Sequence, residues 1–218
     1  MEKGLLGIVE IKQEFHNIEE KIFEYFTSGK YIYEWPEDFV RFGSPFALAF
    51  LIEAYARDGG TGKALDLIRR EWGAMLDYGA TTTWEILSPR TRSHCHAWSA
   101  MPAFFLSSHV LGVKPRGIIS NGMVIAPEPV DLTWARGSFP TPKGAVKVLW
   151  SRGEKSLTLW VELPSGLNGE VVMPSFILAS AEISIKASCG SLKAFFENGR
   201  WKAELPAGVK ACVKATLK

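Results

Sequence analysis

Apolar residues recur at helical spacing through the first half of the chain. Two such stripes are Ile11, Phe15, Ile18, Ile22 and Phe26, and Leu65, Ile68, Trp72, Met75 and Leu76. Residues three and four positions apart lie on the same face of an α-helix. Each stripe therefore predicts an amphipathic helix with one buried face.

Capping residues indicate where a helix between the two stripes begins and ends. Ser44 followed by Pro45 predicts the start of a helix that reaches Asp58, because serine caps helix N-termini and proline fits the first helical turn. Gly59 and Gly60 predict its end, because glycine tolerates the left-handed conformation that follows many helices.

Two more helices follow in the pattern. Thr61 is expected to cap a helix over 61–78 that stops at Gly79. A further helical stretch is predicted over 97–111, with Pro102 either in its first turn or at a kink. With the preceding helix and the N-terminal stripe, the first half of the chain predicts four helices joined by short links.

After Pro115 the hydrophobic period becomes two. The alternating apolar positions are Val146, Val148 and Trp150; Leu157, Leu159, Val161 and Leu163; and Val209, Ala211, Val213, Ala215 and Leu217. Successive side chains of a strand point to opposite faces, so these runs predict strands with one buried face. The sequence thus predicts a mostly α-helical region over 1–114 and an all-β sandwich domain over 115–218.

Composition and charge narrow the function classes. The chain has 218 residues, of which 47% are hydrophobic and 22% charged, and a formal net charge of +2. These values are typical of a folded protein, and they favour neither a nucleic-acid partner nor a membrane surface. Glu2, Glu10 and Glu14 interrupt the N-terminal apolar run, so we expect neither a signal peptide nor a membrane span.

The number and spacing of the cysteines indicate the redox environment of the protein. Cys95, Cys189 and Cys212 are odd in number and far apart, which does not predict a disulfide framework. We therefore expect a reducing environment and a cytoplasmic location.

Candidate chemistry is concentrated between Gly79 and Ala100. Glu85 follows three threonines and Trp84 on a segment that connects two predicted helices, and such segments commonly aim side chains into clefts. A carboxylate there could act as a general base if it stays ionised and within reach of a water molecule. The alternative is a capping or salt-bridged surface glutamate.

The aromatic and imidazole side chains nearby leave similar alternatives. Trp84 and Trp98 could stack on a sugar ring or pack in the core. His94 and His96 bracket Cys95, but no second Cys or His cluster completes a zinc site. Hydrogen bonds to a hydroxyl-rich ligand or to buried carbonyls are favoured for both histidines, and we expect no metal and no cofactor.

Four segments together resemble a known family. They read GSPFALAFLIEAYARDG, IRREWGAMLDYGATTTWE, SHCHAWSAMPAFFLSSHVLGVKP and DLTWARGSFPTPKGAVKVLW. In order and with short gaps, they are similar to the C-terminal part of the α-L-rhamnosidases of glycoside hydrolase family 78. The resemblance covers about residues 18–165. It implies part of an (α/α)6 barrel that performs inverting hydrolysis of terminal rhamnose, followed by a β-sandwich.

The same resemblance implies roles for individual residues. The glutamate of the GATTTWE motif, Glu85, corresponds to the general base. The histidine of the following S-x-x-H stretch, His96, corresponds to a residue that contacts sugar hydroxyls. Trp84 and His94 are assigned to substrate binding more weakly, and Trp98 is kept as a substrate-binding candidate from its residue type. The implied ligand is a rhamnose-containing glycoside or oligosaccharide.

The sequence also departs from the family pattern. An inverting glycosidase needs a second carboxyl group as general acid, about 6.5–9.5 Å from the base. In relatives this acid lies upstream, in a part of the barrel without a counterpart here. Glu53, Asp58 and Asp66 carry no feature that marks them as a replacement.

A partial barrel should expose apolar helix faces, and large exposed patches are rare on soluble monomers. We expect a separately encoded N-terminal barrel fragment or self-association to cover them, unless the chain is the remnant of a split gene. The predicted function is a fragment or subunit of a rhamnosidase-like hydrolase that supplies the base and sugar contacts. The alternative is a non-catalytic carbohydrate-binding or interaction module.

Overall fold

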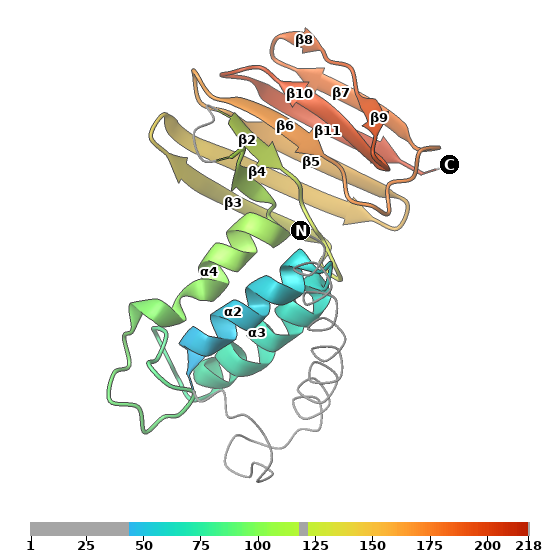
Figure 1. The fold of residues 1–218 in the computed structure, drawn as a ribbon. Coiled ribbons are helices and arrows are strands. Elements are labelled where there is room, and N and C mark those ends of the chain that lie inside the picture. The colour runs from blue at the N-terminus through green and yellow to red at the C-terminus, as the bar shows by residue number, and fades with distance from the viewer. Residues whose placement is uncertain (1–43, 118–121, 218) are drawn as a thin grey trace, which may run out of the picture.

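The computed structural model describes residues 44–117 and 122–217. The predicted helical stripe from Ile11 to Phe26 lies outside these ranges. Figure 1 shows a helical part below two β-sheets, with the chain passing once from the helices to the sheets. The change from helical to alternating periodicity along the sequence corresponds to this division.

Short helices form the first part. They are α2 (Pro45–Arg57), α3 (Thr61–Asp77), the 3-10 turn η1 (Ala97–Ser99), α4 (Met101–Phe105) and the π turn η2 (Leu106–Val110). Helix α2 packs against α3 and also against η1 and α4. The partial (α/α)6 barrel that the family resemblance implies is not established by these elements and stays a prediction.

The predicted start of α2 is confirmed, whereas the predicted cap of α3 is wrong. The Ser44 hydroxyl accepts a hydrogen bond from the Phe46 amide, and Pro45 occupies the first turn. The N-cap of α3 is Gly60, which makes no side-chain cap bond. Thr61 is instead the first residue of the helix, and its hydroxyl donates to the carboxylate of Glu128. A long-range partner has taken the hydroxyl that local capping would use.

The stripe on α3 is largely confirmed. Leu65, Ile68, Trp72 and Met75 are buried, but Leu76 is 69% exposed. The buried face of α3 also includes Ala64 and Leu67, so it is centred away from Leu76. Leu76 lies at the edge of the stripe, and among the described residues nothing covers it.

The helical stretch predicted over 97–111 is present but interrupted. Pro102 lies in the first turn of α4, which was one of its two predicted positions, and not at a kink. The helix then widens into the π turn, in which the Leu111 amide donates to the Leu106 carbonyl at 2.8 Å. The sequence contains no signal for this widening.

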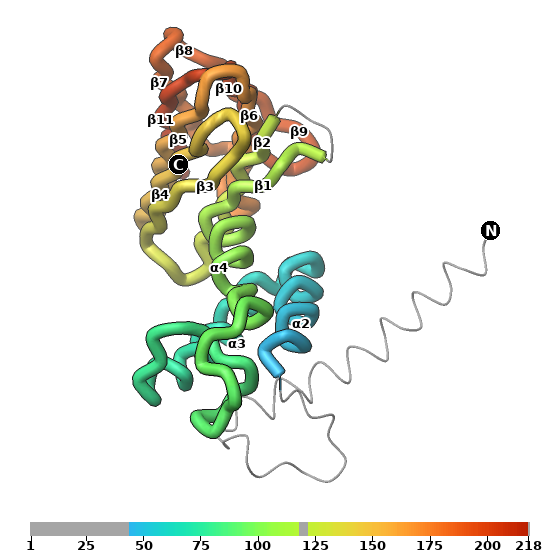
Figure 2. The backbone as a smooth tube through the Cα atoms, turned by 90° about the vertical axis from the view of Figure 1, so that its left-hand side faces the viewer, coloured from blue at the N-terminus to red at the C-terminus, as the bar shows by residue number. Residues whose placement is uncertain are grey.

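The second part consists of two sheets, which we call the two-sheet domain. Its strands are β1 (Val113–Pro115), β2 (Gly122–Ile125), β3 (Trp134–Thr141), β4 (Gly144–Gly153), β5 (Ser156–Glu162), β6 (Asn168–Val172), β7 (Glu182–Ala187), β8 (Gly190–Ser191), β9 (Phe195–Glu197), β10 (Arg200–Leu205) and β11 (Lys210–Thr216). One sheet has the order β1-β2-β6-β10-β9 and the other β3-β4-β5-β11-β7-β8. The β2–β6 pair is parallel, and the other pairs are antiparallel. Figure 2 shows the two sheets facing each other.

The predicted alternation matches the buried faces of three strands in the six-stranded sheet. On β4, Val146, Val148 and Trp150 are at most 2% exposed, while the intervening Lys147 points outward. The predicted inner residues of β5 and β11 are buried in the same way. These strands therefore place their apolar residues between the sheets.

The helices and the two-sheet domain meet at a packed joint. The Trp150 indole N–H donates to the Val110 carbonyl at 3.0 Å, and the Ala126 amide donates to the Gly112 carbonyl at 2.8 Å. Gly112 has a φ of 85°. A Cβ atom there would lie 2.3 Å from the Ala126 carbonyl carbon, so only glycine allows this approach. Since β1 already begins at Val113, the boundary between 114 and 115 stays a prediction.

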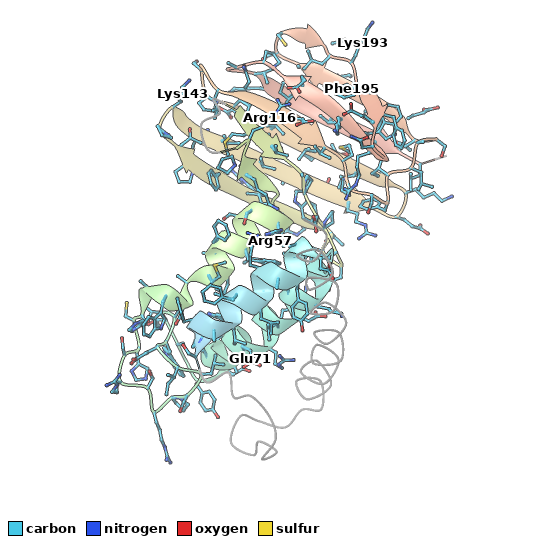
Figure 3. The ribbon with its side chains drawn as sticks, in the orientation of Figure 1. Arg57, Glu71, Arg116, Lys143, Lys193 and Phe195 are labelled. Atoms are coloured by element: carbon cyan, nitrogen blue, oxygen red, sulfur yellow. The ribbon has the colours of Figure 1, made fainter. Side chains whose placement is uncertain are left out.

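A buried histidine lies at the same joint. His109 Nε2 is 3.3 Å from a Glu53 carboxylate oxygen, and its Nδ1 is 3.1 Å from Lys114 Nζ. Arg57 also binds Glu53 at 3.0 Å, at the end of α2 nearest the sheets (Figure 3). Burial and the positive charge of Lys114 lower the pKa of His109 below its ordinary 6.5, although Glu53 and Glu128 oppose this shift.

We expect the free energy of unfolding to decrease as the pH falls below 6.5. In that range the unfolded chain binds a proton that the folded His109 resists, so acid favours unfolding. The pKa of Glu53 is also lowered: burial would raise it, but hydrogen bonds from Arg57 and His109 outweigh burial. Its contribution is lost only below its ordinary 4.5. Urea titrations between pH 7 and about pH 5 avoid the range in which the Glu53 contribution is lost, and a His109 variant separates the His109 contribution from those of other groups in this window.

The matched variants for this titration are His109→Gln and His94→Gln. His109→Gln should remove the loss of stability that His109 causes in that window, whereas His94→Gln, which changes an exposed ring, should leave the pH dependence intact. Equal slopes for the two variants would show that His109 is not the titrating group.

No helix within 44–117 or 122–217 combines the length and the apolar character of a transmembrane helix.

Candidate active site

The candidate residues lie on one long loop, Gly79–Ala100, at the end of the helices away from the sheets (Figure 1). Gly79 has a φ of 81° and ends α3, with the Ala80 amide donating to Met75 at 3.0 Å. The Trp72 indole N–H donates to the Ser99 carbonyl at 2.7 Å. The buried Ser99 hydroxyl donates to the Trp84 carbonyl. Both ends of the loop are thus fixed to α3.

Within the loop, two arms pair with each other. The Glu85 amide donates to the Ser93 carbonyl at 3.0 Å, and the His96 amide donates to the Thr83 carbonyl at 2.9 Å. The Thr83 hydroxyl donates back to the His96 carbonyl at 3.1 Å. These bonds bring Glu85 and His96 onto neighbouring arms although eleven residues separate them in sequence.

The Glu85 carboxylate is mostly buried but remains accessible to solvent. Its side chain is 14% exposed, and Oε1 accepts a hydrogen bond from the Arg92 guanidinium at 3.0 Å. Arg92 itself is 89% exposed, so this ion pair lies at the surface. Within the described ranges no residue donates to the other oxygen, Oε2. That oxygen can accept a proton from water, as a general base must.

Trp98 joins the two candidate site residues. Its ring centroid lies 4.1 Å from that of His96, with the planes tilted by 40°. Its indole N–H donates to the Glu85 carbonyl at 3.4 Å. Trp98 is 45% exposed, and Phe46 at the start of α2 lies 5.7 Å from its ring. Trp98 thus presents an exposed apolar ring beside the His96 imidazole and next to the arm that carries Glu85, an arrangement suited to binding a sugar.

The other two candidates have different environments. Trp84 is 4% exposed and belongs to the hydrophobic core, with the His94 ring against it at 5.1 Å. This burial favours the packing interpretation of Trp84 over the stacking one. His94 is exposed, and its Nε2 lies 3.3 Å from the Pro89 carbonyl, so its ring helps to hold the loop.

Sequence reasoning missed three residues of this site. Arg92 pairs with Glu85, Ser99 fixes the loop to Trp84, and Phe46 extends the exposed aromatic surface. Ser99 and Phe46 had no distinguishing signal. The SPRTRS stretch holds two basic residues, Arg90 and Arg92, and the separation of seven positions between Glu85 and Arg92 does not match the three- or four-residue spacing of a helical ion pair. The signal for Arg92 in the sequence was therefore weak.

A buried carboxylate on α3 was also missed. The Glu71 side chain is 4% exposed and accepts a hydrogen bond from Arg70 at 2.8 Å. Burial raises its pKa above the ordinary 4.5, although the bond to Arg70 opposes this shift. The other acidic residues considered on the helices, Glu53 and Asp66, pair with Arg57 and Arg69.

We expect Glu71→Gln to stabilise the protein at pH 7. The folded state favours the protonated form of Glu71, so its contribution to stability is lost as the pH rises above 4.5, and glutamine removes the buried charge while keeping an acceptor for Arg70. A gain of about 1 kcal/mol would raise Tm by about 2–4 °C. The control is Asp66→Asn on the exposed face of the same helix. If thermal melts at pH 7 show no gain, or an equal gain at pH 4, burial of the charge is not the cause.

Two family descriptions match the chain. The bacterial α-L-rhamnosidase six-hairpin glycosidase domain matches residues 39–110. The bacterial α-L-rhamnosidase C-terminal domain matches residues 121–185. The first range contains the Gly79–Ala100 loop, and the second covers the start of the two-sheet domain.

Individual relatives agree. An α-L-rhamnosidase of Alteromonas sp. (strain LOR) is 28% identical over 160 residues, which is 66% of this chain and 17% of the relative. The solved family 78 rhamnosidase of Bacillus sp. GL1 is 43% identical over 66% of this chain and 16% of that chain, with a TM-score of 0.59. The α-L-rhamnosidase of Dictyoglomus thermophilum shares the fold, with a TM-score of 0.65 and 21% identity over 78% of this chain and 20% of that chain.

The chain therefore spans a fifth or less of these relatives. Both family descriptions, the curated relatives and the family 78 structure point to one group. The chain belongs to glycoside hydrolase family 78 and matches a part of its α-L-rhamnosidases.

Proposed function

We propose that this chain supplies the general base and part of the sugar-binding surface of an inverting α-L-rhamnosidase-type glycoside hydrolase. The observation that carries the proposal is the pairing of the two loop arms. It places Glu85 and His96 on neighbouring arms, with the half-exposed Trp98 packed against the His96 ring and bonded to the Glu85 backbone carbonyl.

In the proposed reaction, Glu85 Oε2 takes a proton from a water molecule as its oxygen attacks the anomeric carbon. The bond to the leaving oxygen breaks at the same time, and a general acid protonates that oxygen. The products are the free sugar with inverted configuration and the aglycone alcohol. Arg92 holds the other carboxylate oxygen and so orients Glu85.

The sugar contacts follow from the same geometry. Trp98 presents an exposed apolar face on which the C–H groups of a sugar ring can stack. His96 lies against Trp98, and its ring nitrogens can exchange hydrogen bonds with the sugar hydroxyls. The ligand we propose is a rhamnose-containing glycoside.

We propose that the general acid comes from a separate barrel fragment. Phe46, Phe50, Leu76 and Phe104 on the helices are 48–69% exposed, and such a set is a surface for further helices to cover. An interface that completes a barrel should be of obligate size, about 2,000 Å² or more. Self-association is the alternative cover, and size-exclusion chromatography distinguishes the two.

The test is a chimera with the Bacillus sp. GL1 rhamnosidase. This chain replaces the matching 16% of that enzyme, and hydrolysis of p-nitrophenyl α-L-rhamnoside is measured for the chimera and for the chain alone. We expect turnover by the chimera and none by the chain alone. A folded chimera without activity contradicts the proposal.

A further inference from the structure

The outer face of the six-stranded sheet carries two exposed tryptophans. Trp134 on the edge strand β3 is 64% exposed, and Trp160 on β5 is 41% exposed. The alternate residues of β5 are buried between the sheets, and those of β3 are partly buried. Both indoles therefore extend from the side of the sheet that faces away from the core.

The strand register places these tryptophans in one compact patch. Trp134 is opposite Ser151, and Ser151 is opposite Thr158. In the next outward row, Arg136 is opposite Leu149, which is opposite Trp160. We call these six residues the outer Trp face. The tryptophans are two strands and two residues apart, which corresponds to about 12 Å.

The chemistry of this face fits a glycan better than a protein. Protein interfaces have an apolar centre and a polar rim. Here Ser151 and Leu149 lie between the two indoles, and Arg136 and Thr158 occupy the other two corners of the face. Indole faces attract sugar C–H groups, and Ser151, Thr158 and Arg136 can bond to sugar hydroxyls. A spacing of about 12 Å is too wide for one ring, so an oligosaccharide is required.

Charge on the same side of the sheet indicates the class of glycan. The outward-facing basic residues of the sheet are Arg136, Lys147, Lys186, Lys210 and Lys214, and the acidic ones are Glu162 and Glu182. Glu162 is already bound by Lys147 and Lys210, each at 3.5 Å. Among the described residues, Arg136 and Lys186 contact no carboxylate. The excess of positive charge on this side of the sheet favours an anionic ligand.

We propose that the outer Trp face binds an acidic polysaccharide, with uronate rings stacked on Trp134 and Trp160 and a carboxylate near Arg136. This surface is separate from the Gly79–Ala100 loop, which lies at the far end of the helices (Figure 1). The proposal adds a polymer-anchoring surface to the proposed hydrolase, and binding here does not need Glu85.

The test is affinity electrophoresis of the full chain in gels containing polygalacturonate, with neutral dextran as the comparison polymer. We expect retardation by polygalacturonate alone. Trp134→Ala and Trp160→Ala should each weaken it about three- to tenfold. Arg136→Gln should weaken it more at low salt than at high salt, because exposed charges are screened. Phe195→Ala is the matched control, since Phe195 is 42% exposed on β9 of the other sheet (Figure 3).

Several outcomes would overturn the proposal. These are absence of retardation, equal retardation by dextran, and a loss caused only by Arg136→Gln, which would indicate non-specific attraction. Self-association that Trp160→Ala abolishes would assign the face to a second copy of the chain. The Glu85→Gln variant should bind polygalacturonate like the parent. Failure of the catalytic proposal is therefore distinguishable from failure of this one.

Discussion

In the rhamnosidase chimera, Glu85→Gln should lower kcat by about 10²- to 10⁴-fold, the range expected when a general base is removed. Glutamine has the same shape and can keep the bond to Arg92, but it cannot take a proton from water. KM should change little, because the contacts of His96 and Trp98 with the sugar stay in place. Steady-state hydrolysis of p-nitrophenyl α-L-rhamnoside measures both constants.

The matched control for this substitution is Glu204→Gln. Glu204 is an exposed residue of the two-sheet domain that pairs with Arg116, so the same chemical change there should leave kcat and KM unaltered. A Trp98→Ala variant should show the opposite pattern to Glu85→Gln, with a raised KM. Activity that survives Glu85→Gln within a factor of about ten would reject Glu85 as the base.

Trp150→Ala should cost about 3–5 kcal/mol of unfolding free energy, the largest effect on stability that we expect. Trp150 is 0% exposed, so alanine leaves a large cavity between the sheets. The change also removes the donor to the Val110 carbonyl, which links β4 to the π turn. Since single domains are stable by about 5–15 kcal/mol, urea denaturation should show a strongly reduced midpoint.

Trp134→Ala is the control for the same change of side chain. Trp134 is 64% exposed on β3, so its removal should alter stability by no more than about 0.5 kcal/mol. Trp150→Phe separates the two contributions, because it keeps an aromatic ring but not the indole N–H. A midpoint for Trp150→Ala close to that of Trp134→Ala would contradict the packing described for the joint.

Local periodicity predicted the parts of the fold that depend on one buried face. Strands β4, β5 and β11 bury the alternating residues that the sequence indicated, such as Val148 and Leu159. Successive side chains of a strand point to opposite faces, so the apolar set can face the core in only one register. The start of α2 at Ser44 was equally predictable, since its cap bond joins residues two positions apart.

Features that depend on distant partners could not be predicted in this way. Thr61 is one example, because its hydroxyl bonds Glu128 instead of capping α3. Leu76 is another, because it lies outside the face that α2 covers. The π turn over Leu106–Val110 also forms without any signal in the sequence. The local pattern predicts that a helix forms, whereas the partners of the residues at its ends depend on which distant segments the fold places beside them.

The candidate site shows the same division. The segment around Glu85, His96 and Trp98 was identified from residue types and from the family resemblance. Arg92 was missed, because its contact with Glu85 depends on the pairing of two irregular loop arms. Glu71 was missed as well, since a carboxylate on a helix gives no indication in sequence that it is buried.

Chemical rescue of Glu85→Ala by azide in the chimera tests the central claim most directly. Azide is an anion that needs no base, and it fits the space left by the side chain. It should attack the anomeric carbon in place of water while the acid protonates the departing aglycone. We predict that azide restores turnover and that NMR shows a rhamnosyl azide of inverted configuration. No rescue, or a product of retained configuration, would contradict the assignment of Glu85 as the base.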